Sequence, residues 1–377
     1  MLEPLLVKVS EFFPNHRKSC IKNVLILALC ILLKESVNLY KLKGSVGTVL
    51  GNETSDSSSH YKRLIRLFDN YAFSRLWLDL LGFVFSLLQA KVDTLLLDGT
   101  SWQSGEKCYH YLTLCIVYEG VAIPIYWLNL HKSGVSNCSE RKKLIKKARR
   151  HFILAGKTLI ADREYLGTDW FKFLLDSKID FVIRLREKAY KEAINKSKGR
   201  SYEELKKKVA GSKVRKKVLK KSFVLQGMDL YFVLFKNPKK DPKEPLVYLI
   251  TNLDKEAKKI AQTYAIRWKI EHCFKHLKSN GFQLEQINLR TEARCKLLMA
   301  ITVLAYTLSI QQGLKTYKKV YVKKYSDGTK YKEVSLFRHG LDSLMKFCQN
   351  INTFTQYILK QFKQKKYKNK CRFTRNV

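Results

Sequence analysis

The segment VDTLLLD (residues 92–98) opens the part of the sequence that decides the fold. Two more apolar segments follow it through short links, YHYLTLCIVY (109–118) and VAIPIYWLNL (121–130). Runs of this length, rich in β-branched and aromatic residues, are typical of strands, and the two-residue link Glu119-Gly120 favours a hairpin between the second and third. The sequence therefore predicts three consecutive strands between residues 92 and 130.

The residues after this hairpin alternate between helical and strand patterns. A basic helix is expected at about 139–152, a strand at TLIAD (158–162), a helix at about 168–177 and a strand at DFVIRLR (180–186). Three strands, a helix, a strand, a helix and a strand are the element order of a ribonuclease-H-like sheet. The predicted fold class is α/β, with a ribonuclease-H-like catalytic core.

The core is predicted to be interrupted. Residues 188–250 are strongly basic and contain the strand-like segments SFVLQ, LYFVLF and PLVYLIT, so we interpret them as a β-rich insertion. A long helix at about 255–279, stopped by Asn280-Gly281, and an apolar helix at about 292–314 resume the core. The expected division is a helical DNA-binding region (1–70), core (71–187), insertion (188–250), core (251–315), and a helical C-terminal region with a basic tail (316–377).

The N-terminal region is predicted to be helical, with a break at the glycine-rich GSVGTVLG (44–51). A helix in SDSSSHYKRLIRLF (55–68) would carry Lys62, Arg63 and Arg66 beside apolar residues. Such a helix could read DNA as part of a helix-turn-helix, or it could be an ordinary solvated helix. No motif decides between the two.

The net charge of the chain indicates what class of molecule it binds. The chain has 72 Lys and Arg against 32 Asp and Glu, a net charge of +40. So large a surplus is typical of proteins that bind a polyanion, and nucleic acid is the natural one. No membrane partner is expected, because the early apolar run at 24–33 is too short to span a bilayer. Nine scattered cysteines without a CxxC pair indicate reduced thiols in the cytoplasm.

Two scarce acidic residues end apolar runs. Asp98 follows LLL and precedes Gly-Thr-Ser-Trp, and Asp162 follows LIA and precedes Arg-Glu-Tyr. Ligand sites form at the carboxyl ends of strands in α/β sheets, and Mg²⁺ prefers carboxylate oxygens. The alternative is that each aspartate only caps the next turn.

The segment YAIRWKIEHCFKHLK (264–278) carries a third acid, Glu271. On one continuous helix, Tyr264, Arg267, Glu271 and Lys278 share an exposed polar face about 60° wide, which Lys275 joins. Glu271 could complete a metal site while the cations hold phosphates. An amphipathic surface helix with mixed charges would explain the same periodicity.

These residues resemble a known family, the bacterial insertion-sequence transposases of the DDE type, in the branch with a Y-R-E-K signature (insertion-sequence-four type). The resemblance rests on DGTSW around Asp98, ADREYLG around Asp162, the signature at Tyr264, Arg267, Glu271 and Lys278, and SLFRHGLDSL near the carboxyl end.

The resemblance implies that Asp98, Asp162 and Glu271 bind two Mg²⁺ ions, with Mn²⁺ as an expected substitute. It implies nicking at the element's end, a DNA hairpin intermediate and strand transfer into target DNA. The expected partners are double-stranded DNA with terminal inverted repeats, target DNA and a second copy of the chain in a homodimer on paired ends. The expected location is the bacterial nucleoid in the cytoplasm.

One feature departs from the family. Its best-studied members stack a flipped base on a Trp of the insertion, whereas the five Trp here (77, 102, 127, 170 and 268) lie outside residues 188–250. Tyr231, Phe232 or Phe235 could substitute, or could be core residues of strands. Two other functions stay open: a catalytically inactive, transposase-derived DNA-binding protein, and a different nuclease on the same fold.

Overall fold

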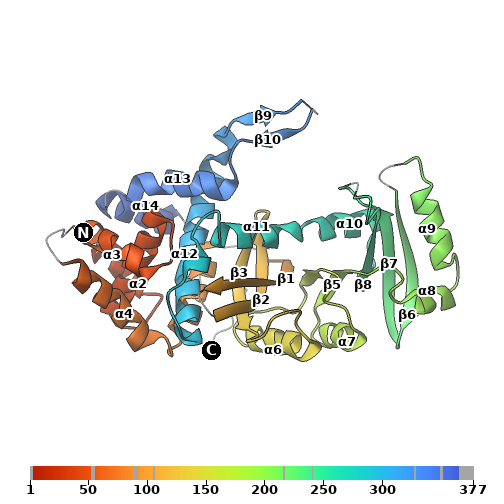
Figure 1. Cartoon of the computed structure of the whole chain (residues 1–377), viewed down its shortest axis with the longest axis horizontal. Coiled ribbons are helices and arrows are strands. Elements are labelled where there is room, and N and C mark those ends of the chain that lie inside the picture. The colour runs from red at the N-terminus through yellow and green to blue at the C-terminus, as the bar shows by residue number, and fades with distance from the viewer. Residues whose placement is uncertain are drawn as a thin grey trace. The chain divides into compact units, whose positions relative to one another are not determined.

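The computed structural model describes residues 3–51, 56–88, 92–104, 107–214, 217–239, 241–326, 328–348 and 351–364. The chain forms two compact units, which are described separately (Figure 1). The helical unit comprises Met1–Ala90, Trp102–Lys107 and Phe274–Thr374, and the sheet unit comprises Lys91–Ser101, Cys108–Cys273 and Arg375–Val377. Most of the predicted basic tail, residues 365–377, lies outside the described residues.

The sheet unit is built on one mixed sheet of eight strands in the order β3-β2-β1-β4-β5-β8-β7-β6. The strands are β1 (Thr94–Ser104), β2 (Lys107–Tyr118), β3 (Val121–Asn129), β4 (Thr158–Ala161), β5 (Asp180–Arg184), β6 (Val218–Leu225), β7 (Met228–Lys236) and β8 (Leu246–Thr251). The predicted hairpin is confirmed, since β2 and β3 pair antiparallel across Glu119 and Gly120. Both turn residues have positive φ, 46° and 74°, as a two-residue hairpin turn requires.

The parallel part of the sheet is its buried centre. β1 pairs parallel with β4, and β4 pairs parallel with β5. Leu95, Leu96, Ile160 and Val182 are at most 1% exposed, as expected for strands covered on both faces. Figure 1 shows α6 (Cys138–Ala148) and α7 (Thr168–Asp176) on one side of these strands and α10 (Ala257–Ala265) on the other. The sheet unit is therefore a mixed α/β structure, as predicted.

The predicted insertion also contains helices. α8 (Lys191–Lys196) and α9 (Tyr202–Ala210) precede β6, and Tyr202 packs against Phe232 of β7 with ring centroids 5.5 Å apart. The three strands of this region do not form a separate sheet, because β8 pairs with β5 and so extends the central one.

The long helix predicted at about 255–279 is wrong in one respect: it is broken. α10 ends at Ala265 and α11 begins at Trp268, ending at Leu277. Between them, Ile266 and Arg267 donate to the carbonyls of Thr263 and Tyr264, three residues back, which tightens the turn. Tyr264 and Glu271 are consequently carried by different helices, α10 and α11.

The helical unit packs around α12 (Glu292–Thr316). Its other helices are α1 (Glu3–Ser10), α2 (Lys18–Lys34), α3 (Leu39–Leu50), α4 (Ser57–Tyr71), α5 (Leu76–Leu88), α13 (Leu336–Cys348) and α14 (Ile351–Gln364). The segment Glu292–Lys319 is long and apolar enough to span a membrane, but 89% of its apolar window is buried, as in a core helix. The bent pair α4 and α5 also passes that test if it is taken as one span.

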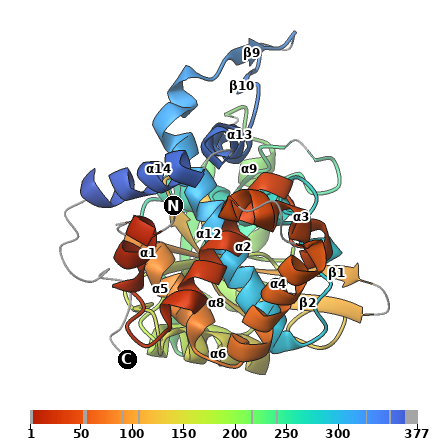
Figure 2. The same cartoon turned by 90° about the vertical axis from the view of Figure 1, so that its left-hand side faces the viewer.

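Two predictions for the helical unit need correction. The glycine-rich segment does not break a helix, because Gly44 and Gly47 lie inside α3, which ends at Leu50 and is capped by Gly51 with a φ of 67°. The break comes earlier, at Glu35, which adopts a φ of 49°. The C-terminal region is not only helical, since β9 (Val322–Lys324) and β10 (Lys330–Lys332) form a two-stranded hairpin within it (Figures 1 and 2).

Candidate active site

Asp98 and Asp162 lie at the same end of the parallel pairing between β1 and β4. The pairing of β1 with β4 ends at Leu97 opposite Ala161, and each aspartate is the next residue of its chain. Asp162 follows the end of β4, as predicted, but Asp98 does not end its strand, because β1 continues to Ser104. The two carboxylates are nevertheless neighbours, because parallel strands in register bring equivalent positions together.

The charged form of the Asp98 carboxyl group is disfavoured by its surroundings. Its pKa is raised to about 7, mainly because burial disfavours the charged form. The backbone N–H of Gly99, 2.9 Å from Asp98 Oδ1, and the charge of Arg267 oppose this shift, whereas the charges of Glu164 and Asp162 add to it. A bound cation would therefore stabilise this position.

In metal-free protein, Asp98→Asn should remove a pH dependence of the free energy of unfolding. Between about pH 4 and pH 7, the folded state keeps a proton on Asp98 that the unfolded state has lost. The contribution of Asp98 to the free energy of unfolding is greatest below about pH 4. It falls as the pH rises and is lost above about pH 7, a total change of at most about 4 kcal/mol. Urea unfolding of both proteins across this range measures it, and parallel pH profiles would contradict it.

The broken helix brings Tyr264, Arg267 and Glu271 to Asp162. The Tyr264 hydroxyl donates to Asp162 Oδ1 at 3.2 Å. Arg267 Nη1 lies 3.8 Å from Asp162 Oδ2, and its Nη2 lies 2.7 Å from Glu271 Oε1. One guanidinium thus bridges the second and third acids of the predicted triad.

The prediction that these residues lie on an exposed face is wrong for Tyr264 and Arg267. Tyr264 is 6% exposed and Arg267 is 5% exposed. Burial and the charge of Asp162 raise the pKa of Tyr264, so its hydroxyl stays protonated and donates. Burial alone would lower the pKa of Arg267, but Tyr264, Asp162 and Glu271 more than offset it, and the pKa is raised. These side chains face the acids.

The other predicted DNA-contacting residues lie in the helical unit. Lys275 is exposed, and Lys278 Nζ lies 3.3 Å from Glu285 and 6.0 Å from the centre of the Trp102 ring. On α4, the side chains of Lys62, Arg63 and Arg66 are all exposed, opposite a buried apolar stripe. Arg63 Nη1 donates to Asn23 Oδ1 at 3.3 Å. The arrangement of α4 suits both readings, DNA contact and a solvated helix.

Two residues beside the site were missed in the sequence. Glu164 has a raised pKa, because of burial first and the charge of Asp162 second. The hydroxyl of Tyr165, which is 2% exposed, lies 3.4 Å from Asp98 Oδ1. Both belong to the run Asp-Arg-Glu-Tyr that begins at Asp162, so the density of polar residues after a buried strand was a usable signal.

Arg141 of α6 holds the loop that carries these residues. It is 5% exposed and donates to the carbonyl of Glu164 at 2.8 Å, the carbonyl of Leu166 at 3.2 Å and the hydroxyl of Ser136 at 3.1 Å. A second bond reaches the Ser136 carbonyl. The loop after Asp162 is therefore tied to α6 by a single guanidinium.

Arg141→Met should lower the free energy of unfolding by about 3 kcal/mol, because it leaves buried carbonyls without donors. Arg141→Lys should recover part of the loss, since an ammonium reaches fewer of them. Urea unfolding checks both, and a methionine variant as stable as the wild type would show that the loop does not depend on this residue.

The three predicted acids, Asp98, Asp162 and Glu271, are not arranged as they would be around a bound metal ion. Among the described residues, no three His, Cys, Asp or Glu side chains lie close enough to hold an ion. Asp98, Asp162 and Glu164 affect one another electrostatically, whereas Glu271 is paired with Arg267. Carboxylate oxygens are the donors that Mg²⁺ prefers, so the chemistry of the donor set fits, but Glu271 has to be released first.

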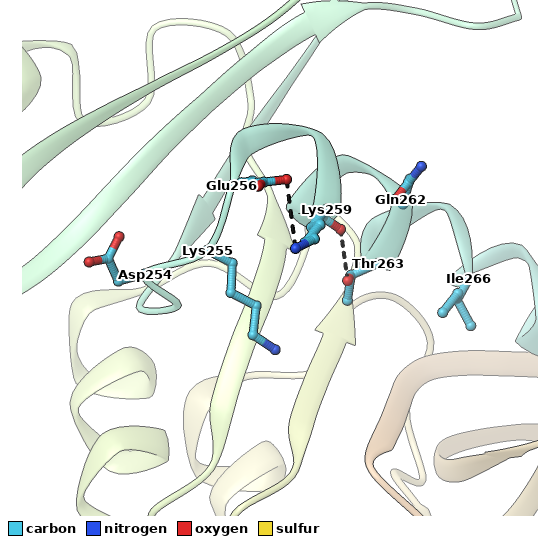
Figure 3. Close-up of a pocket in the computed structure, with 7 residues that line it drawn as sticks. All are labelled: Asp254, Lys255, Glu256, Lys259, Gln262, Thr263 and Ile266. Carbon is cyan, nitrogen blue, oxygen red and sulfur yellow. Dashed lines mark hydrogen bonds and ion pairs between the residues drawn. The ribbon is translucent and has the colours of Figure 1, made fainter.

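A separate pocket of about 650 Å³ lies along α10 (Figure 3). Glu256 and Lys259, three residues apart at the start of this helix, form an ion pair of 3.7 Å, and the Thr263 hydroxyl donates to the Lys259 carbonyl at 2.9 Å. None of the three acids lines this pocket. Asp254, which also lines the pocket, pairs with Lys220 of β6 at 2.7 Å.

The candidate stacking residues of the insertion differ in their surroundings. Phe232 is 1% exposed and packs on Tyr202 and Tyr248, so it belongs to the core. Phe235 is half-buried. Tyr231 lies under Lys220, whose Nζ is 4.3 Å from the ring centre. None of the three presents a fully open ring.

Comparison with known proteins places the chain in a family. Residues 90–308, more than half of the sequence, match the transposase DDE domain. No curated protein matches. A solved structure described as the piggyBac transposase synaptic complex with hairpin DNA aligns with 92% of this chain and 74% of that chain, at 13% identity and a TM-score of 0.47, too low to carry an argument. Members of the matched family transfer phosphoryl groups on DNA and typically use divalent metal ions. The chain belongs to the transposase DDE domain family.

Proposed function

We propose that the chain is a cut-and-paste transposase of the Y-R-E-K branch, acting through a ribonuclease-H-like core formed by β1 to β5. The observation that carries this proposal is the convergence of Tyr264, Arg267 and Glu271 on Asp162, whose neighbour is Asp98. A solvated surface helix would not bury its tyrosine and arginine against a carboxylate. The strand order β3-β2-β1-β4-β5 supports the proposed core.

Asp98, Asp162 and Glu271 would hold two Mg²⁺ ions, or Mn²⁺ in their place. When bound, such ions activate the attacking oxygen and stabilise the transferred phosphoryl group. The raised pKa of Asp98 supports this assignment, because a buried carboxyl short of positive charge is suited to a cation. The three acids supply only oxygen donors, which suits a hard ion.

Arg267 is proposed to bind carboxylates when no ion is present and a DNA phosphate when DNA is bound. Without an ion it compensates Asp162 and Glu271, and its planar fork fits a carboxylate or a phosphate equally well. A DNA phosphate that takes over the guanidinium would free Glu271. Tyr264 keeps Asp162 oriented through its hydroxyl, so the acid is in place whichever partner Arg267 has.

The net charge of +40 supports double-stranded DNA ends and target DNA as partners. Lys275, Lys278 and the basic residues of α4 are proposed to contact phosphates. The hairpin intermediate and a homodimer on paired ends follow from the resemblance to the Y-R-E-K branch and are proposed on that ground.

An inactive, transposase-derived DNA-binding protein is the second candidate. The pairing of Glu271 with Arg267 favours it, because the triad is not assembled in the structure. The two candidates differ in one result. An active transposase cuts DNA in Mg²⁺, whereas the inactive protein only binds it.

The test uses purified full-length chain and DNA that carries the inverted repeats flanking its gene. We expect cleavage at one defined junction in Mg²⁺, none in EDTA, and a 3′-hydroxyl at the cut. DNA binding without cleavage in Mg²⁺ and in Mn²⁺ would favour the inactive protein.

A further inference from the structure

Exposed aromatic rings are concentrated on one hairpin of the helical unit. Tyr321 is 69% exposed, Tyr325 47% and Tyr331 62%, although tyrosines elsewhere in the described chain are mostly covered. Both views show β9 and β10 extending away from α13 (Figures 1 and 2). We propose that this tyrosine–lysine ribbon (residues 321–326 and 328–332) binds a DNA strand whose bases are unpaired, which rests on the proposed function and assigns it a further DNA contact.

The register of the ribbon separates its side chains onto two faces. Tyr331 pairs with Lys323, and Lys330 pairs with Lys324. Since cross-strand partners share a face and successive residues alternate, Tyr321, Tyr325 and Tyr331 fall on one face with Lys323. The rings of Tyr325 and Tyr331 lie 6.0 Å apart, and Lys323 Nζ is 5.6 Å from the Tyr325 ring, as this register requires.

The opposite face is cationic. Lys324 and Lys330 stand directly across from each other, are exposed, and form no ion pair with a carboxylate of the described residues. Like charges in directly opposed positions destabilise a strand pair, and a two-stranded ribbon alone is marginal in water. A polyanion on this face would remove the repulsion.

The two faces together define the ligand. Lysines attract phosphates, and each such contact releases counterions. Open aromatic rings stack on nucleobases, which needs base faces that are not already stacked in a duplex. A DNA strand with unpaired bases satisfies both faces, whereas an intact duplex satisfies only the lysines. The ribbon therefore supplies the open rings that Tyr231, Phe232 and Phe235 do not.

The test measures binding of full-length chain to a 5′-labelled oligonucleotide of about 20 nucleotides and to its duplex, by fluorescence anisotropy. The double variant Tyr325→Ala/Tyr331→Ala should bind the single strand about tenfold more weakly and the duplex within about twofold of wild type. The control Tyr325→Phe/Tyr331→Phe keeps both rings and should bind both probes normally. All variants should have the same melting temperature as the wild type, because the substituted side chains are exposed.

The cationic face has its own readout. Lys324→Gln/Lys330→Gln should reduce the slope of log affinity against log salt on the single strand by about 1.4, and Lys324→Arg/Lys330→Arg should keep the slope.

Several outcomes would overturn the inference. The inference fails if the alanine variant binds the single strand as tightly as wild type, or if it loses the same affinity for the single strand and for the duplex. It also fails if wild type binds RNA of the same sequence more tightly than DNA, or if the alanine variant changes its oligomeric state and keeps its DNA affinity. If wild type cuts element ends while the ribbon variants bind normally, only the ribbon assignment fails. If wild type neither binds nor cuts DNA, the proposed function itself fails.

Discussion

Asp162→Asn is expected to reduce metal-dependent DNA cleavage by at least about 10³-fold, with the affinity for the same DNA within about twofold of wild type. Asp162 is the residue on which the site converges: it contacts both Tyr264 and Arg267 and adjoins Asp98. The amide keeps the shape of the side chain but removes the charge that an ion requires. DNA affinity comes from cations, which this change leaves in place.

The matched control is Asp176→Asn, because Asp176 is an exposed aspartate at the end of α7 in the same unit. Its cleavage rate should equal that of wild type. Gel assays of the element-end substrate in Mg²⁺ give both rates, and anisotropy gives the affinities. An Asp162→Asn protein that cut within tenfold of wild type would remove this residue from the site.

Arg267→Gln is expected to lower the free energy of unfolding of the metal-free protein by about 3 kcal/mol. The change leaves Asp162 and Glu271 without the guanidinium they share, and removing one partner of a buried pair is costly. The figure is at the lower end for such pairs, because the side chains of Asp162 and Glu271 are 26% and 38% exposed.

The same substitution should make Mn²⁺ a stronger stabiliser. In the wild type an ion competes with Arg267 for the acids, whereas in the glutamine variant the acids have no other cation. Thermal melting in EDTA and in Mn²⁺ measures both effects, with Arg267→Lys as the control that keeps the charge without the planar fork. Equal melting of wild type and Arg267→Gln in EDTA, with equal shifts in Mn²⁺, would contradict the bridging role.

The strands of the centre were predictable from sequence, and the contacts of the signature residues were not. The apolar runs that became β1 to β5 leave little choice of structure, because their side chains have to be buried. Periodicity at 264–278 fitted one exposed helix face. It could not reveal the break at Ile266 and Arg267. This break accompanies the burial of Tyr264 and Arg267 against Asp162, which lies about a hundred positions earlier in the sequence.

Two other differences have local causes. α3 continues through Gly44 and Gly47 because Leu42, Val46 and Val49 are buried on its neighbours, and this packing outweighs the low helix propensity of glycine. The ribbon of β9 and β10 was missed because it has no apolar face. Its strands, Val-Lys-Lys and Lys-Tyr-Lys, are mostly lysine, so hydrophobicity does not mark them as strands.

We propose that Glu271, and not Glu164, completes an ion site with Asp98 and Asp162. Titration of Mn²⁺ into wild type, Glu271→Gln and Glu164→Gln, followed calorimetrically, separates the two glutamates directly. We expect Glu271→Gln to weaken ion binding at least about tenfold, and Glu164→Gln to bind like wild type. Loss of binding in Glu164→Gln together with normal binding in Glu271→Gln would contradict the assignment.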